Sequence, residues 1–192
     1  MEKISNYLKG EWGDKKFKRY VIFNLFIMIA LVCEFILFKY DILKIIRYVV
    51  LLEGIVVIAW IDIKTKKIPN RILITLLGIR VVLIVLEMIR FSEYAMVILM
   101  SSLLGMLIGF VMFIIPYFIT RGGIGMGDVK MFAVIGCYVG SAVVMPSALF
   151  TVLSSAIYSG VQLIRRKTQL KDEIALGPFI LIGIIITMGL GF

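Results

Sequence analysis

Long apolar runs, separated by short polar segments, dominate this chain. Runs long enough for a transmembrane helix, which needs about 20 residues, cover 20–38, 43–61, 72–89, 95–118 and 174–192. The stretch 130–164 is also apolar, with Pro146 near its middle, and we interpret it as two helices, 130–145 and 147–164, joined by a tight turn. The pattern predicts seven transmembrane helices, whereas a β-barrel would show alternating apolar and polar positions.

The overall composition is that of a membrane protein. The chain has 192 residues, of which 61% are hydrophobic, and its mean hydropathy is +1.07. Soluble domains contain about 45–50% apolar residues. We therefore predict an all-α polytopic protein whose surroundings are a lipid bilayer.

The net charge of +9 changes this picture little. A basic balance is typical of nucleic-acid-binding proteins, but these basic residues lie mainly in short segments between apolar runs, where they set membrane orientation. We expect no nucleic-acid partner. With a cytoplasmic N-terminus, the inner segments hold Lys3, Lys9, Lys15, Lys16, Lys18, Arg19, Lys64, Lys66, Lys67, Arg71, Arg121, Lys130, Arg165, Arg166, Lys167 and Lys171, and the outer ones only Lys39, Lys44, Arg47 and Arg90. An unsplit helix at Pro146 would place the last basic cluster outside, so the charge pattern favours the split.

Metal-ligating residues are scarce. The chain has no His, and its two Cys, Cys33 and Cys137, both lie inside predicted spans. A zinc site built from four Cys, or from Cys and His, is therefore excluded. We expect neither a metal nor another cofactor.

Two aspartates stand at the edges of apolar runs. Asp62 follows the second predicted span and Asp128 precedes the fifth, so both are expected at the cytoplasmic face. Each alone has an ordinary explanation. Asp62 could be a solvated acid at a helix end, and Asp128 could be the N-cap of a helix that follows a glycine-rich loop. Carboxylates beside hydrocarbon are costly, however, and often functional.

As a pair, these aspartates predict acid–base chemistry. Two neighbouring carboxyl groups cannot both ionise easily, so one keeps a proton while the other acts as a base. Aspartic proteases use this arrangement to activate a water molecule. A rival interpretation is a proton- or cation-coupled small membrane transporter that uses the paired aspartates. Such a protein is expected to hold its acids near the middle of the membrane and often shows an inverted repeat, which is not evident here.

The spacing around these acids resembles a known family. An Asp-x6-Pro-Asn pattern runs from Asp62 through Pro69 to Asn70, and Gly-x-Gly-Asp-Val-Lys covers residues 125–130. Together with Leu-Gly-Pro-Phe at 176–179, this order resembles the type IV prepilin peptidases, which are membrane aspartic peptidases, over residues 45–192. The resemblance implies a six-helix catalytic core, catalytic Asp62 and Asp128, and cleavage of prepilin-like or pseudopilin leader peptides at the cytoplasmic face of the cell membrane.

The same resemblance suggests roles for further residues. Gly125 and Gly127 would shape the loop that holds Asp128, and Pro69, Asn70 and Lys130 would shape or bind the substrate site. Many bacterial members also carry paired Cys-x-x-Cys motifs and methylate the new N-terminus. This chain has no such cysteines, so we expect no methyltransferase activity. We expect residues 1–44 to form a basic tail and an extra transmembrane helix outside the core.

Other features predict packing. The pairs Gly105–Gly109 and Gly136–Gly140 have the spacing that lets membrane helices approach closely. Charged residues within or near apolar runs are expected to form structural ion pairs or to extend toward the interface; they are Glu34, Glu53, Arg80 and Glu87.

Overall fold

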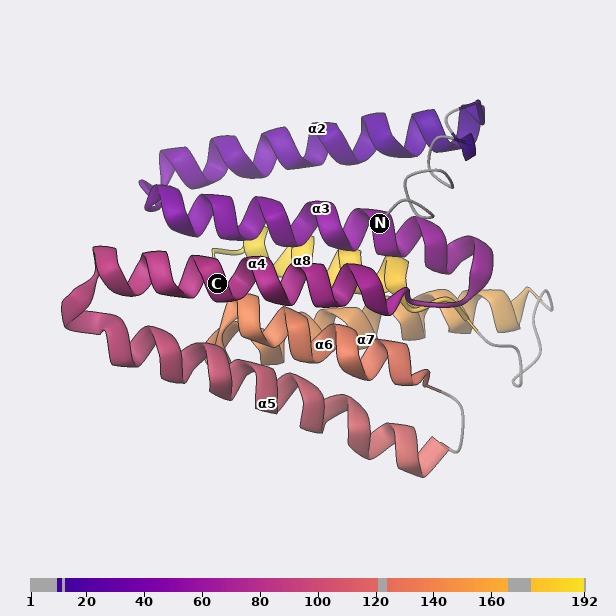
Figure 1. Ribbon diagram of the computed structural model, residues 1–192. Coiled ribbons are helices and arrows are strands. Elements are labelled where there is room, and N and C mark those ends of the chain that lie inside the picture. Colours follow the sequence, from indigo (N-terminus) through magenta and orange to yellow (C-terminus); the bar gives the residue numbers. More distant parts are fainter. Residues whose placement is uncertain (1–9, 12, 121–123, 166–173, 192) are drawn as a thin grey trace. The chain divides into compact units, whose positions relative to one another are not determined.

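The computed structural model describes the chain apart from residues 1–9, 12, 121–123, 166–173 and 192. Parts of the predicted basic segments, and Gly122 and Gly123 of the glycine-rich loop, lie outside the described residues. Each of the seven predicted spans corresponds to one helix (Figure 1). These helices are α2 (Lys15–Leu37), α3 (Ile42–Thr65), α4 (Asn70–Arg90), α5 (Ala95–Thr120), α6 (Met126–Val139), α7 (Ser141–Ile164) and α8 (Gly177–Gly189).

The prediction of an all-α polytopic membrane protein is confirmed. Within the described residues, four segments are long and apolar enough to cross a membrane: Lys15–Leu37, Asn70–Arg90, Ser92–Ile119 and Ser141–Ile164. The third combines α5 with a short 3-10 helix, Ser92–Tyr94. The helices α6 and α8 are shorter, at 14 and 13 residues, and α3 carries five charged residues along its 24.

The chain divides into two compact units, Met1–Asp41 and Ile42–Phe192. In the first, α2 begins after Asp14, whose side chain accepts a hydrogen bond of 2.8 Å from the backbone N–H of Lys16. This is a standard N-cap contact. The second unit contains α3 to α8 and both candidate aspartates. Its boundary falls at the start of α3.

The stretch 130–164 is split as predicted, but at a different residue. The break lies at Gly140, with φ of 86°, and Pro146 is inside α7. Side chains other than Gly rarely adopt this φ, so glycine permits the corner. A Cβ at position 140 would also come within 2.6 Å of Ser101 Oγ on α5. The hydroxyl of Ser101 accepts a bond from the N–H of Ser141, the first residue of α7.

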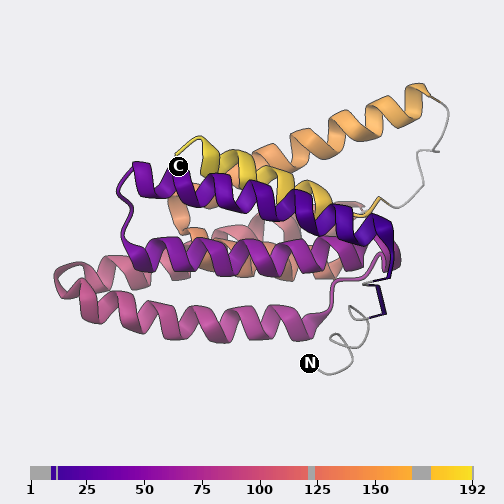
Figure 2. The same ribbon diagram turned by 90° about the horizontal axis from the view of Figure 1, so that it is seen from above.

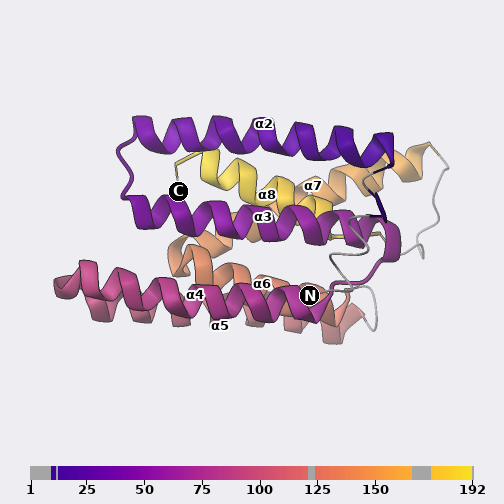
Figure 3. The ribbon, with the colours of Figure 1, turned by 45° about the horizontal axis from the view of Figure 1, so that its top comes forward.

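The glycine pairs pack α5 directly against α6, which confirms their predicted role. A Cβ on Gly105 would collide with the backbone carbonyl of Gly136, and one on Gly136 would collide with that of Gly105. A Cβ on Gly109 would meet the carbonyl of Phe132. The two helices run side by side in Figures 1 and 3. This backbone contact fixes α6, which carries Asp128.

Glycine also sets the position of α8. Gly183 lies against the backbone of Thr151 and the carbonyl of Ser147 on α7. A Cβ added at Gly177 would lie only 3.1 Å from the Cα of Ala59 on α3. The helix α8 is therefore held between α7 and α3. The later half of α7 leaves the other helices of its unit, as Figure 2 shows, and its apolar side chains there are exposed, among them Ile157 and Ile164. Exposed apolar side chains suit a lipid environment.

Candidate active site

Four helix ends of the second unit meet on one side, on the right in Figure 1. They are the C-terminal end of α3 and the N-terminal ends of α4, α6 and α8. Three contacts join these ends: Gly177 to Asp62, Gly127 to Ile68 and Lys130 to Asn70. Asp62 and Asp128 therefore lie at the same end of the helices, and the cytoplasmic location of that end stays a prediction.

Asp62 lies near the end of α3 and is only 4% exposed. Its Oδ2 accepts a hydrogen bond of 2.8 Å from the backbone N–H of Gly177. Gly177 is the first residue of α8, so the partial positive charge of a helix N-terminus faces this carboxylate. Hydrogen bonds to the ionised form favour that form. Asp62 is thus a buried acid equipped to hold a negative charge.

Asp128 lies in the first turn of α6 and is half-buried. It is not the N-cap considered above, because Gly125 occupies that position. The Asp128 carboxylate reaches back and accepts a hydrogen bond of 3.1 Å from the N–H of Gly125. This is the acidic half of a capping box. The contact holds the side chain at the end of the helix, on the side where Asp62 lies.

The electrostatic environment raises the pKa of both acids, which lie just outside the predicted spans. Desolvation by burial and, to a smaller extent, the negative charge of Asp62 together raise the pKa of Asp128 to about 6, although the bond from Gly125 lowers it. Burial also raises the pKa of Asp62, whereas the bond from Gly177 lowers it. The Coulombic contribution means that the two carboxyl groups interact, as an acid–base pair requires.

The remaining predicted residues surround this pair. Gly127 lies in α6 and not in a loop, and a Cβ there would come within 3.0 Å of the Cβ of Ile68, so glycine allows α6 to approach the α3–α4 connection. Pro69 is the N-cap of α4, and Asn70 is its first residue. Lys130 Nζ lies 3.5 Å from Asn70 Oδ1, and both side chains are exposed. The predicted residues are therefore neighbours in space.

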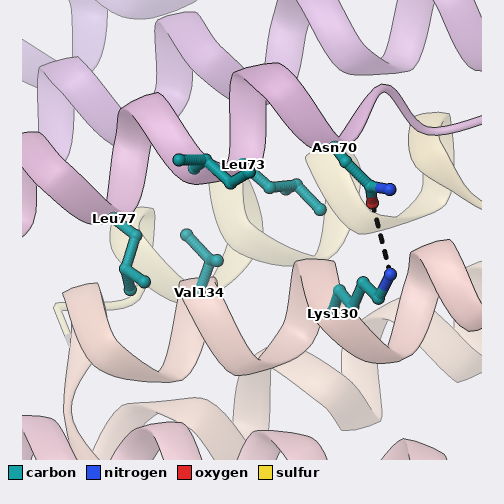
Figure 4. Close-up of a pocket in the computed structure, with 6 residues that line it drawn as sticks. Asn70, Leu73, Leu77, Lys130 and Val134 are labelled. Atoms are coloured by element: carbon teal, nitrogen blue, oxygen red, sulfur yellow. Dashed lines mark hydrogen bonds between the residues drawn. The ribbon is translucent and has the colours of Figure 1, made fainter.

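A groove of about 310 Å³ runs between α4 and α6, beginning at this pair of residues (Figure 4). Asn70 and Lys130 form its polar mouth, and its walls are apolar. Leu73, Leu77 and Val134 continue from the mouth along the two helices, as Figure 4 shows. The groove starts two residues from Asp128 in the sequence, and it leads along the helix axes away from the pair of acids.

Gly177 is the site residue that the sequence did not assign. Its segment, 176–179, was recognised in the family pattern, but no role was given to it. The residue lies 115 positions after Asp62, and the contact is made by a backbone N–H. A backbone donor leaves no mark in a side-chain pattern. The Gly-Pro pair at the start of an apolar run was the available signal, since proline favours the first turn of a helix.

Fold and site together define a class: a polytopic α-helical membrane protein with two interacting carboxyl groups at one end of its helices. The chain belongs to the type IV leader peptidase family, whose model matches residues 49–160, more than half of its length. It is also similar to the prepilin leader peptidase/N-methyltransferase of Bacillus subtilis (strain 168), with 32% identity over 138 residues. That match covers 72% of this chain and 53% of the relative, so the chain spans about half the length of the protein it matches. No solved structure matches the chain.

Proposed function

We propose that the protein is an aspartic-type endopeptidase that cleaves the leader peptides of prepilin-like or pseudopilin precursors. The observation that carries this proposal is the pair Asp62 and Asp128, two interacting acids of raised pKa at one end of the fold. Family membership supports peptidase activity. The methyltransferase activity in the relative's name is not part of the proposal.

In the proposed mechanism, Asp62 is the base. The N–H of Gly177 stabilises its ionised form. Asp62 takes a proton from a water molecule while the water oxygen bonds to the scissile carbonyl carbon. Asp128, protonated, gives its proton to the carbonyl oxygen, which yields a neutral gem-diol. Asp62 then passes its proton to the leaving nitrogen as the C–N bond breaks, and Asp128 recovers a proton from a gem-diol hydroxyl.

This mechanism predicts the sign of the pH dependence. Asp62 must be ionised, so activity is lost as pH falls through its pKa. Asp128 must be protonated, so activity is lost as pH rises through the pKa of about 6 that burial and Asp62 give it. The profile of kcat/KM should therefore be bell-shaped, because it reports the acid and base of the free enzyme.

The site also restricts the substrate. A peptide bond in a regular helix has its carbonyl hydrogen-bonded and its faces covered by side chains, so the cleaved bond must be extended or unwound. Glycine favours unwinding because it is a poor helix former. We therefore propose a cut immediately after a small residue, Gly, at the membrane boundary. The position of the acids at one end of the helices suits this cut, whereas a proton-coupled transporter would hold its acids near the middle.

The groove between α4 and α6 is the proposed site for the precursor segment next to the scissile bond. Its apolar walls suit an apolar segment, and Asn70 and Lys130 at its mouth offer polar groups to backbone carbonyls. Lys130→Met should then raise KM for the precursor severalfold and leave kcat nearly unchanged, because Lys130 touches neither reacting proton. An unchanged KM would remove Lys130 from the binding site.

The experiment that tests the function is co-expression of the protein with a matched precursor. Asp62→Asn and Asp128→Asn should each abolish cleavage while the protein still inserts into the membrane. Asp41→Asn is a matched control, because Asp41 precedes α3 at the end opposite to Asp62. Full cleavage by either active-site variant would refute the proposed pair.

A further inference from the structure

A cluster of buried charges lies away from the candidate active site. Arg80, in the middle of α4, is only 1% exposed. Its Nη1 pairs with Glu87 Oε2 at 3.0 Å, its Nη2 donates to Ser102 Oγ on α5 at 2.8 Å, and its Nε donates to the backbone carbonyl of Cys137 on α6 at 2.9 Å. One guanidinium thus joins three helices.

Arg47 brings α3 into the same cluster. It is the sixth residue of that helix, and its Nη1 lies 3.1 Å from Oε1 and 3.4 Å from Oε2 of Glu87. The sequence predicted ion pairing for Arg80 and Glu87 but assigned Arg47 to the basic residues of the outer face. Glu87 therefore connects α4 to both α3, through Arg47, and α6, through Arg80.

The two helices joined in this way are those that carry the aspartates. Asp62 follows Arg47 by 15 residues, about 22 Å along α3 at 1.5 Å per residue. Asp128 precedes Cys137 by nine residues, about 14 Å along α6. A packed helix moves as a rigid body over such lengths, so a slip or rotation at the cluster would be transmitted to the carboxyl group at the other end.

Stability alone does not account for such a cluster. Two guanidinium groups share one carboxylate, so a positive charge remains in excess. Buried ion pairs often stabilise no better than well-packed apolar residues, whereas they can specify one arrangement. The bond from Arg80 to the carbonyl of Cys137 likewise specifies one arrangement of α6 against α4. That carbonyl lies in the last turn of α6, before the break at Gly140, where helices leave carbonyls unsatisfied.

We propose that the Arg47–Glu87–Arg80 cluster is a positioning element for the aspartate pair, which fixes the axial register of α3 and α6 against α4. The proposal rests on the proposed peptidase function, in which the separation of Asp62 and Asp128 decides the rate. The cluster touches neither substrate nor reacting atoms. Tyr138 adds a parallel link, because its hydroxyl donates to the carbonyl of Leu76 on α4 at 2.7 Å.

The first test measures geometry without activity. Cysteines would replace both acids, as Asp62→Cys and Asp128→Cys, in a background with Cys33→Ser and Cys137→Ser, and a short bifunctional thiol reagent would cross-link them in membranes. Glu87→Gln should slow this cross-linking severalfold. Glu53→Gln is the matched control, because Glu53 is an exposed carboxylate on α3, and it should leave the rate unchanged.

A second variant, Arg47→Gln, tests the same link in case Glu87→Gln fails to fold. Arg47→Gln removes the connection to α3 but leaves Glu87 paired with Arg80, so the remaining buried charges balance. It should also slow cross-linking. Equal rates in a folded Arg47→Gln and in the parent protein would overturn the proposal, whatever the outcome for Glu87→Gln.

The activity test separates this proposal from the proposed function. In the protein with both aspartates, Arg47→Gln should lower kcat on the order of tenfold to a hundredfold, the cost of about 1 Å of misplacement, with KM nearly unchanged. A change in KM alone would contradict a positioning role. If Asp62→Asn retained cleavage, the peptidase mechanism would fail instead, and the cross-linking result would still report whether the cluster sets the register.

Discussion

The bond from Gly177 to Asp62 gives a quantitative prediction. A Cβ at position 177 would come within 3.0 Å of Asp62 Oδ2 and 3.1 Å of the Cα of Ala59. The second contact is with backbone, which cannot swing aside, so α8 must move away from α3. The two further methyl groups of valine enlarge that movement. Gly177→Val should therefore break the hydrogen bond of 2.8 Å that favours the ionised form of Asp62.

The size of the effect follows from the bond that is lost. A hydrogen bond to a charged group contributes about 1.5–3 kcal/mol, and one pKa unit corresponds to about 1.4 kcal/mol. Loss of the bond should raise the pKa of Asp62 by about 1–2 units. Since the proposed mechanism requires ionised Asp62, the acidic limb of the kcat/KM profile should move to higher pH by the same amount. The alkaline limb reports Asp128 and should stay near its original position.

The assay is precursor cleavage in detergent between mildly acidic and neutral pH, with the variant and the parent protein side by side. Gly78→Ala is the control, because a Cβ at that position of α4 would meet no side chain and no other helix within 4 Å among the described residues. It should leave both limbs in place. If the acidic limb of Gly177→Val coincides with that of the parent, the N–H of Gly177 does not stabilise the base and the assignment of Asp62 as base is wrong.

Two further predictions concern orientation and substrate. Single cysteines would be placed by Thr65→Cys and Ile124→Cys in a background without Cys33 and Cys137. They should react with an impermeant thiol reagent only after the membrane is opened, because the basic segments favour a cytoplasmic location. Labelling of intact cells at either position would contradict this orientation. Replacement of the precursor's Gly at the cut by Val should slow cleavage severely, and Ala should be tolerated better, because the larger, branched side chain of Val would obstruct the close approach of residues 125–127 to the scissile bond. Equal rates for Gly and Val, or a product cut deep in the apolar helix, would refute the proposed substrate geometry.

Hydropathy predicted the helices well, because it depends on local sequence, and the number of helices between the two acids explains why both lie at one end of the fold. The position of the break between α6 and α7 was wrong. Proline was taken as the breaker, yet Pro146 lies six residues into α7, and the corner is at Gly140, where the backbone needs a positive φ. A single glycine in an apolar run does not reveal its φ. The contact with Ser101 that accompanies the corner is a tertiary feature.

Contacts between distant segments could not be predicted from the sequence. The pairing of Arg80 with Glu87 was within reach, since residues seven apart share a helix face. Arg47 joins them from a position 40 residues before Glu87, and no local pattern links the two. The donor to Asp62 is a backbone group even further away. A sequence pattern identifies which side chains could react, whereas the packing of helices that are distant in the sequence decides which backbone groups surround those side chains.

The environments of the two acids assign their roles in the proposed reaction. The exposed fraction of Asp62 is smaller than that of Asp128, and burial alone would favour the neutral form of both acids. The N-terminus of α8 opposes that tendency at Asp62, because its N–H points at this carboxylate in a site from which water is largely excluded. Asp128 accepts a bond from its own helix N-terminus, but it also faces the charge of Asp62. Ionising Asp62 first therefore raises the cost of ionising Asp128, so the proton stays on Asp128. The proposed base therefore lies on α3 and the proposed acid on α6, and the N-terminus of α8 favours this assignment because it stabilises the ionised form of Asp62.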